Sequence, residues 1–139
     1  MKNYTLINNL TGWLVCAIAC TVYLLTMEPT ASFWDCGEFI ASANKLEVGH
    51  PPGAPFFMIV ANVFSHLTSD PTQAARMVNT MSALASGFTI LFLFFTITHL
   101  VRKVIAGSQS SLSAAQVTGI MGSGIVGALT YTFTDTFWF

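Results

Sequence analysis

Two long stretches of this sequence contain no charged side chain, and each is long enough to cross a lipid bilayer. Residues 10–27 and 77–100 lack Asp, Glu, Lys and Arg entirely. A helix rises about 1.5 Å per residue, so roughly 20 residues cover the hydrocarbon core of about 30 Å. The chain is 53% hydrophobic and 8% charged, whereas about a quarter of the residues in soluble domains are charged. The sequence therefore predicts an all-α integral membrane protein.

A third uncharged segment completes the expected membrane region. Residues 112–133 follow a polar turn at 107–111 and predict a third transmembrane helix. Gly119, Ser123 and Gly127 recur in it at four-residue spacing, and such a stripe of small residues lets another helix approach closely. The stripe therefore predicts packing against further transmembrane helices. The chain ends in a run of aromatic residues without a return helix, which favours a fragment of a longer polytopic protein.

The expected module covers residues 1–139, and its outer loop, 28–76, holds most of the acidic side chains. Four of the six acids lie in the first part of this loop: Glu28, Asp35, Glu38 and Glu47. Residues 35–46 predict a short helix capped by Ser32, because four apolar residues recur at helical spacing: Phe39, Ile40, Ala43 and Leu46. Residues 56–67 are apolar but short, and a stretch of that length is more often interfacial or re-entrant than spanning. We therefore expect an outer loop of short interfacial helices.

The placement of basic residues predicts the orientation of these helices. If 56–67 does not span, the second long helix returns the chain to the side of Lys2 and delivers Arg102 and Lys103 there. Because cytoplasmic loops are enriched in Lys and Arg, this side is expected to be cytoplasmic and the acidic loop extracytoplasmic. The net charge of −1 and the scattered basic residues exclude nucleic acid as a partner. The lipid bilayer is the partner that the composition predicts.

Four sequence motifs, in order and spacing, resemble one family of membrane proteins. They are Trp34-Asp-Cys-Gly-Glu-Phe39, His50-Pro-Pro-Gly-Ala-Pro55, Ala75-Arg-Met-Val-Asn79 and Tyr131-Thr-Phe-Thr-Asp135-Thr-Phe-Trp138. The family is bacterial, was at first of unknown function, and is related to the protein O-mannosyltransferase-like proteins. The resemblance covers nearly the whole chain. It implies the N-terminal part of a glycosyltransferase of the GT-C type, in the bacterial inner membrane with its active loop in the periplasm.

The resemblance also implies a reaction and a catalytic acid. Members of this type transfer a sugar from a polyprenyl phosphate to a hydroxyl, here expected to be protein Ser or Thr, and use an acid in the first outer loop. That position matches Asp35, which would serve as the general base, with Glu38 as the second acid. Asp35 alternatively only caps its helix. Glu38 could hold a divalent cation with Asp35, orient the acceptor, or contact the helix start.

The phosphate leaving group requires cationic or hydrogen-bonding partners on the outer side of the membrane. Three residues of the loop meet this requirement: His50, Arg76 and Lys45. Arg76 could instead snorkel at a helix end, and His50 could be an ordinary polar loop residue. No dedicated metal-binding motif is present in the sequence.

Two other functions compete with the enzyme hypothesis. A small accessory subunit would dock into a larger membrane complex through the stripe Gly119, Ser123 and Gly127. A transporter would line a path with polar intramembrane residues, but Asn79 and Gln116 are the candidates and neither is charged. Transport therefore ranks behind both other hypotheses.

Overall fold

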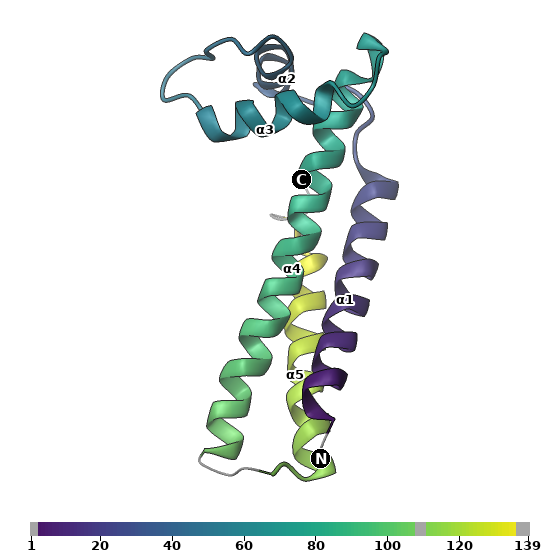
Figure 1. The fold of residues 1–139 in the computed structure, drawn as a ribbon, viewed down its shortest axis with the longest axis vertical. Coiled ribbons are helices and arrows are strands. Elements are labelled where there is room, and N and C mark those ends of the chain that lie inside the picture. The colour runs from purple at the N-terminus through teal and green to yellow at the C-terminus, as the bar shows by residue number, and fades with distance from the viewer. Residues whose placement is uncertain (1–2, 108–110, 136–139) are drawn as a thin grey trace. The chain divides into compact units, whose positions relative to one another are not determined.

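The computed structural model describes residues 3–107 and 111–135, and its regular elements are all helical (Figure 1). They are α1 (Tyr4–Thr26), α2 (Cys36–Lys45), α3 (Pro55–Ser65), the short 3-10 helix η1 (Pro71–Gln73), α4 (Ala74–Ala106) and α5 (Ala114–Thr132). The chain divides into two compact units. Unit 1 comprises Met1–Tyr23 and Ala85–Phe139, and unit 2 comprises Leu24–Leu84. The all-α prediction is confirmed for the described residues.

Two of the described helices are long and apolar enough to cross a membrane. They are α1 and the continuous helical segment Pro71–Ala106. In each of these helices, only 28% of the most apolar 18-residue stretch is buried within the structure. Their apolar side chains are thus mostly exposed, as in lipid-facing helices and unlike the core helices of soluble proteins. The third span stays a prediction, since α5 is helical but is not among the two that meet this test.

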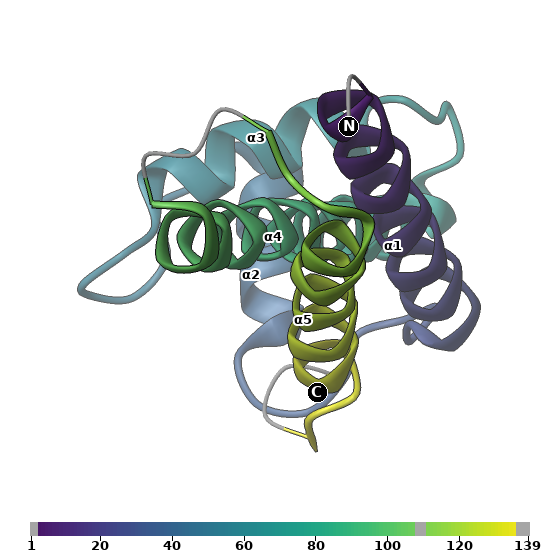
Figure 2. The ribbon, with the colours of Figure 1, turned by 90° about the horizontal axis from the view of Figure 1, so that it is seen from below.

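In unit 1, α1, the second part of α4 and α5 lie side by side, as Figures 1 and 2 both show. The Arg102 guanidinium lies 4.5 Å above the centre of the Tyr4 ring, which joins the start of α1 to the end of α4. The Tyr23 hydroxyl donates to the Thr132 carbonyl at 3.0 Å, which joins the ends of α1 and α5. Hence α4 runs antiparallel to α1, and α5 runs parallel to α1.

The direction of α4 supports one part of the predicted topology. Arg102 lies beside Tyr4, so the end of α4 and the start of α1 lie at the same end of unit 1. Lys2 itself, residues 108–110 of the predicted turn, and residues 136–139 lie outside the described part of the chain.

The contact between α4 and α5 depends on two glycines of α5. A Cβ on Gly124 would lie 2.6 Å from Thr98 Cγ2 and 2.8 Å from Phe94 Cε2, and one on Gly127 would lie 2.7 Å from Ile97 Cδ1. Both glycines therefore allow a close approach that larger residues prevent. Gly127 thus packs within this chain, whereas the expectation assigned it to an external helix.

Unit 2 folds around an apolar cluster shared by α2, α3 and the first turns of α4. Its buried members are Ala43, Met58, Ala61, Val78 and Met81, and Phe39, Ile40, Phe57, Val60 and Phe64 pack against them. The predicted apolar stripe of α2 is confirmed at Phe39, Ile40 and Ala43. It is wrong at Leu46, which is 59% exposed because it follows the last helical residue in a left-handed conformation with φ of 54°.

The N-terminus of α2 also differs from the prediction. The helix begins at Cys36, so Asp35 occupies the N-cap position and the prediction of Ser32 as the cap is wrong. Ser32 instead donates from its hydroxyl to Cys36 Sγ at 3.2 Å. At the other end of α2, Asn62 of α3 donates to the carbonyls of Ala43 and Asn44 at 2.9 and 3.0 Å. These bonds satisfy carbonyls that a helix end leaves without partners, and they fix α3 against α2.

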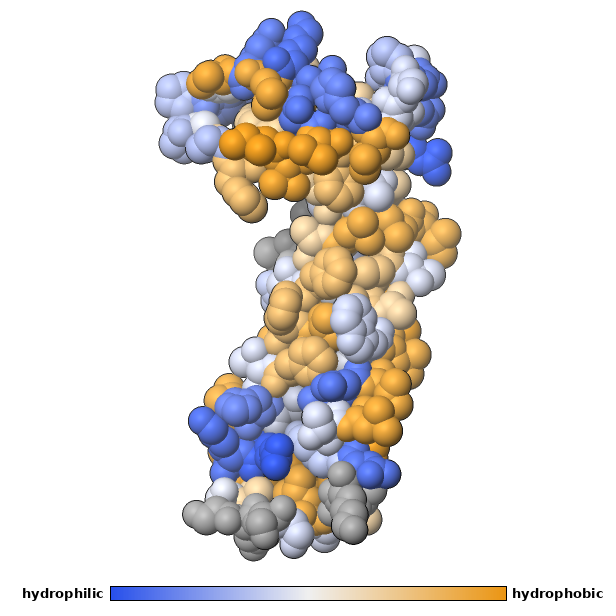
Figure 3. Space-filling view, in the orientation of Figure 1, coloured by the Kyte–Doolittle hydropathy of each residue, from blue (hydrophilic) through white to orange (hydrophobic). Residues whose placement is uncertain are grey.

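The helix α3 has the length and surface expected of an interfacial helix. Its 11 residues cover roughly 17 Å at about 1.5 Å per residue, well short of the bilayer core. Phe56, Ile59 and Val63 recur on its exposed side, opposite the buried Met58 and Ala61. In unit 2, Figure 3 shows hydrophobic side chains, in orange, gathered along one side and hydrophilic side chains, in blue, on the opposite side.

Candidate functional site

Asp35 occupies the N-cap position of α2, but its side chain does not cap the helix. Its backbone carbonyl accepts the first helical bond from the Phe39 N–H at 2.9 Å. Its side chain makes no capping hydrogen bond. The side chain is 63% exposed, so the carboxylate remains accessible to a ligand. The alternative in which Asp35 only caps its helix therefore lacks the hydrogen bond that would define it.

Glu38 is bound to the loop that follows α2. Its Oε1 accepts a hydrogen bond from the His50 backbone N–H at 2.8 Å, and its Oε2 lies 2.9 Å from Nδ1 of the same residue. Both carboxylate oxygens thus contact one residue that lies twelve positions later. Of the three roles considered for Glu38, the contact with the helix start is not formed.

The His50 ring lies between the two acids. Its Nε2 is 3.8 Å from Asp35 Oδ2, while its Nδ1 faces Glu38. The Phe39 ring meets the imidazole edge to face, with centroids 6.3 Å apart and planes at 88°. Asp35 and Glu38 therefore face the same imidazole ring. Their three-residue spacing predicts this, because residues three apart lie on one face of a helix.

Two glycines shape the loop that carries His50. A Cβ on Gly49 would lie 3.2 Å from Glu38 Oε1, so glycine lets the loop pass close to this carboxylate. After His50, the Gly53 N–H donates to the His50 carbonyl at 3.0 Å and closes a turn. Gly53 has a φ of 73°, which glycine adopts without strain. The motif His50-Pro-Pro-Gly53 is thus a turn that presents the imidazole to α2.

The Glu38 and His50 side chains shift each other's ionisation. The hydrogen bond with Glu38, then the Glu38 charge and the weaker Asp35 charge, raise the pKa of His50 above its ordinary value. The hydrogen bonds from the His50 backbone and ring lower the pKa of Glu38. Each side chain therefore favours the charged form of the other, the imidazolium of His50 and the carboxylate of Glu38.

A cavity of about 330 Å³ opens beside Asp35. Phe39, Ile40, Phe57 and Val78 give it apolar walls, and Asp35 provides a carboxylate at its lining. An apolar pocket with a few polar groups is the usual form of a small-molecule site.

Trp34 also lines this cavity and has an unusual conformation. Its φ is 64°, in the left-handed region that bulky residues rarely occupy, and the residue is 96% exposed. Such backbone strain costs about 1–3 kcal/mol and clusters at functional sites. The indole is exposed, so burial does not account for the strained backbone. The strain therefore favours a role for Trp34 in ligand contact.

Sequence reasoning considered Asn79 as a candidate for a transport path. In the structure, Asn79 instead has a structural role at the site. Its side-chain amide donates to the carbonyls of Glu28 and Thr30 at 2.8 and 2.9 Å, which ties the start of the loop to α4. Gln116 forms a capping box with Ser113 at the start of α5. Both polar side chains therefore serve local structure, and a transport path loses its two candidates.

The structure does not bring the other two predicted cations into the cluster. Lys45 Nζ lies 4.0 Å from Glu47 Oε1, and both side chains are exposed. Arg76 is exposed in the first turns of α4. In residues 3–107 and 111–135, neither cation forms an ion pair with Asp35 or Glu38. Their roles in phosphate binding stay predictions.

The described residues contain no group of three or more His, Cys, Asp or Glu side chains arranged to hold a metal ion. Glu38 already uses both oxygens on His50. The shared divalent cation at Asp35 and Glu38 therefore stays a prediction that this geometry does not favour.

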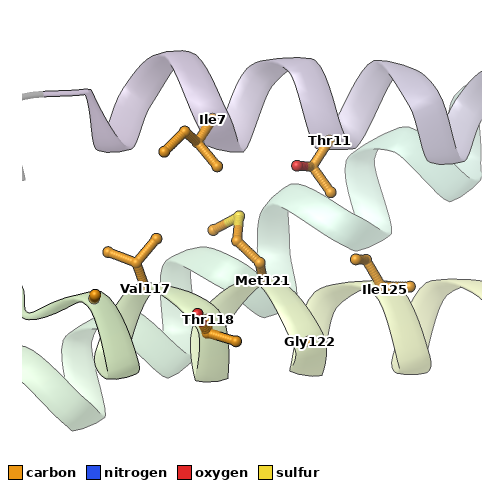
Figure 4. A pocket seen from close by; sticks show the side chains of 8 residues that line it. Ile7, Thr11, Val117, Thr118, Met121, Gly122 and Ile125 are labelled. Carbon is orange, nitrogen blue, oxygen red and sulfur yellow. The ribbon is translucent and has the colours of Figure 1, made fainter.

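A larger cavity, of about 440 Å³, lies in unit 1 between α1 and α5 (Figure 4). Ile7 and Thr11 line it from α1, and Val117, Met121 and Ile125 line it from α5. Its lining contains no titratable side chain, whereas the cavity beside Asp35 has a carboxylate in its lining.

Comparison with known proteins identifies the family. The family model described as the protein O-mannosyl-transferase TMEM260 N-terminal domain matches residues 35–139. The chain belongs to this family. The match begins at Asp35 and includes Glu38 and His50. The expected kinship with O-mannosyltransferase-like proteins is confirmed, while bacterial membership and the GT-C fold stay predictions.

Two curated relatives of the TMEM260 family align with the chain. The protein O-mannosyl-transferase tmem260 of Dictyostelium discoideum is 34% identical over 82 residues, which are 58% of this chain and 10% of that protein. The protein O-mannosyl-transferase TMEM260 of Mus musculus is 30% identical over 111 residues, 80% of this chain and 14% of that protein. The chain thus spans a small fraction of the length of these relatives. No solved structure matches it.

Proposed function

We propose that this chain is the N-terminal catalytic part of a membrane glycosyltransferase of the GT-C type, which transfers mannose from a polyprenyl phosphate to a protein Ser or Thr hydroxyl. The observation that carries the proposal is the accessible Asp35 carboxylate, which makes no capping bond and lines a cavity. The relatives named as protein O-mannosyl-transferases support the sugar and the kind of acceptor.

In the proposed reaction, Asp35 is the general base. It takes the proton of the acceptor hydroxyl while the hydroxyl oxygen bonds to the anomeric carbon of the sugar. The bond from that carbon to the phosphate oxygen breaks, and the lipid phosphate leaves with the electron pair. The sugar carbon passes through an oxocarbenium-like state, which a nearby carboxylate stabilises.

Cations on the same side as Asp35 would stabilise the departing phosphate. His50 is the best placed, because its ring lies 3.8 Å from Asp35 and its pKa is raised. Arg76 is a second candidate, since its guanidinium can bind phosphate with two hydrogen bonds and is always charged. Lys45 is the third candidate, although its ammonium faces Glu47.

The donor distinguishes this proposal from other transferases. We expect the complete protein to transfer mannose from a polyprenyl-phosphate donor to a Ser/Thr peptide, and not from a nucleotide sugar. Radiolabelled donors of both kinds, offered to the purified protein in detergent micelles, test this expectation. Transfer from the nucleotide sugar alone would contradict the donor assignment.

We further propose that the end of α4 is cytoplasmic and that unit 2 is extracytoplasmic. The contact of Arg102 with Tyr4 supports a shared side for the start of α1 and the end of α4, and the short length of α3 supports an interfacial position over an extra crossing. The bacterial inner membrane stays a prediction, since the relatives described above are eukaryotic.

Site-directed labelling tests this topology. A cysteine at the exposed Ser69, in a background without the native cysteines, should react with a membrane-impermeant reagent only from outside. A cysteine at the exposed Lys103 should react only after the membrane is opened. The opposite pattern would place the acidic loop in the cytoplasm.

The accessory role, in which the chain docks with further transmembrane helices, is compatible with the enzyme hypothesis. A Cβ on Gly119 would meet no atom within 4 Å, so the face of α5 that carries Gly119 has room for a neighbour. We propose that additional helices pack on this face of unit 1 through Gly119 and Ser123, whereas Gly127 serves the contact with α4.

A further inference from the structure

The role of Glu38 can be derived from what its carboxylate contacts. One oxygen accepts the His50 backbone N–H at 2.8 Å, and the other lies 2.9 Å from the ring nitrogen Nδ1. A carboxylate engaged at both oxygens and held with a lowered pKa is a weak base for an acceptor hydroxyl. The same contacts leave it poorly placed to bind a cation. Glu38 is therefore poorly suited to act as a base or to share a cation with Asp35.

The contacts of Glu38 instead determine where the His50 ring lies. The backbone bond fixes the loop between Gly49 and Pro51, and the ring bond fixes the rotation of the imidazole. With Nδ1 directed to Glu38, the opposite nitrogen Nε2 is directed to Asp35, 3.8 Å away. The Phe39 ring supports the imidazole from the side. An acid that orients a histidine toward a reacting group is a recurrent arrangement in catalysis.

We propose that Glu38 is a positioning residue that acts through His50: it holds the His50 ring as a cation beside Asp35, where the ring meets the phosphate of the donor. This inference rests on the proposed function, because that function supplies the phosphate. It removes Glu38 from the candidate bases and assigns the acid–base step to Asp35 alone.

The proposal has a definite dependence on pH. The charged groups that act on His50 in the described structure are Glu38 and Asp35, and both favour the protonated ring. The ring therefore keeps its proton to a higher pH than an ordinary histidine and loses it as pH rises through its own pKa. Transfer should decline on the alkaline side as this proton is lost. Without the Glu38 charge, the decline should begin at a lower pH.

The substitution Glu38→Gln tests the positioning role. Gln keeps the shape of the side chain and an oxygen for the His50 N–H but removes the negative charge. In the complete protein labelled with ¹⁵N-histidine, the titration midpoint of His50, assigned by its loss in His50→Gln, should fall in Glu38→Gln. It should not move in Glu47→Gln, a matched control that removes an exposed charge paired with Lys45. An unchanged midpoint in Glu38→Gln would overturn the proposal.

Transfer activity provides the second readout. The alkaline limb of the pH–activity profile should move to lower pH in Glu38→Gln, so the loss of activity relative to the wild type grows as the pH rises. Adding Glu38→Gln to His50→Gln should cost no more than about twofold beyond His50→Gln alone, because residues that act as a unit are not additive. Independent, multiplicative losses would show that Glu38 acts without His50 and would overturn the proposal.

These two readouts separate this inference from the proposed function. The histidine titration needs no substrate, so a normal transfer rate in Asp35→Asn would refute the base assignment while the link between Glu38 and His50 remained measurable. Conversely, loss of transfer in Asp35→Asn together with an unmoved His50 midpoint in Glu38→Gln would refute only the positioning role.

Discussion

Asp35→Asn is expected to lower sugar transfer by the complete protein by roughly a hundredfold or more, the usual contribution of a general base. Asn keeps nearly the same shape and still fits the N-cap position of α2. The Asp35 side chain makes no capping hydrogen bond, so the substitution removes little from the stability of the helix. The expected result is therefore an inserted, folded protein that has lost the proton acceptor. Initial rates with a lipid-phosphate donor and a hydroxyl acceptor measure it.

Asp70→Asn is the matched control for this loss. Asp70 is also an exposed N-cap aspartate of unit 2, but its side chain does cap, since it accepts from the Thr72 N–H at 2.9 Å and the Thr72 hydroxyl at 2.8 Å. Its replacement should reduce stability by about 1 kcal/mol or less and leave the chemistry intact. A similar loss of transfer in both variants would show that the Asp35 effect is structural.

Gly124→Leu is expected to destabilise unit 1 strongly. A Cβ at this position would already lie 2.6 Å from Thr98 Cγ2 and 2.8 Å from Phe94 Cε2, and leucine adds three more carbons. Helices α4 and α5 must therefore separate, at a cost of about 3 kcal/mol, the upper part of the range for overpacked sites. The unfolding midpoint in detergent should fall clearly.

Gly119→Leu is the comparison within the same helix. A Cβ on Gly119 meets nothing within 4 Å, so the chain by itself should tolerate leucine and keep its unfolding midpoint. In the complete protein the same substitution should weaken packing with further helices, if they dock on this face. Equal destabilisation of the isolated chain by both substitutions would contradict the described packing of α5.

The long helices and the position of the acidic loop could be predicted from hydrophobicity alone. The uncharged runs located α1 and α4, and helical spacing located α2 with its buried residues Phe39, Ile40 and Ala43. The errors lie at the helix ends. Leu46 continues the apolar spacing but adopts a left-handed conformation, and Ser32 is a good capping residue placed one turn too early. Spacing does not report where a backbone leaves helical geometry.

The connections that build the site could not be predicted from the sequence. The bond between Glu38 and His50 depends on the path of a loop past Gly49, and periodicity carries no information about that path. Asn62 and Asn79 bind backbone carbonyls far away in the chain. Their polar character in apolar surroundings is a signal that they have partners, but it does not identify them. The sequence motifs thus pointed to Asp35, Glu38 and His50 as candidate site residues. The structure supplied the contacts among them.

The central claim is that Asp35 takes the acceptor proton in the transfer step, and a single-turnover experiment tests it most directly. The complete protein, wild type or Asp35→Asn, is saturated with lipid-phosphate mannose and mixed with excess acceptor peptide, and the rate of glycopeptide formation is followed. We predict unchanged donor binding and a single-turnover rate lowered by roughly a hundredfold or more in Asp35→Asn. A single-turnover rate equal to that of the wild type would contradict the assignment of Asp35 as the base.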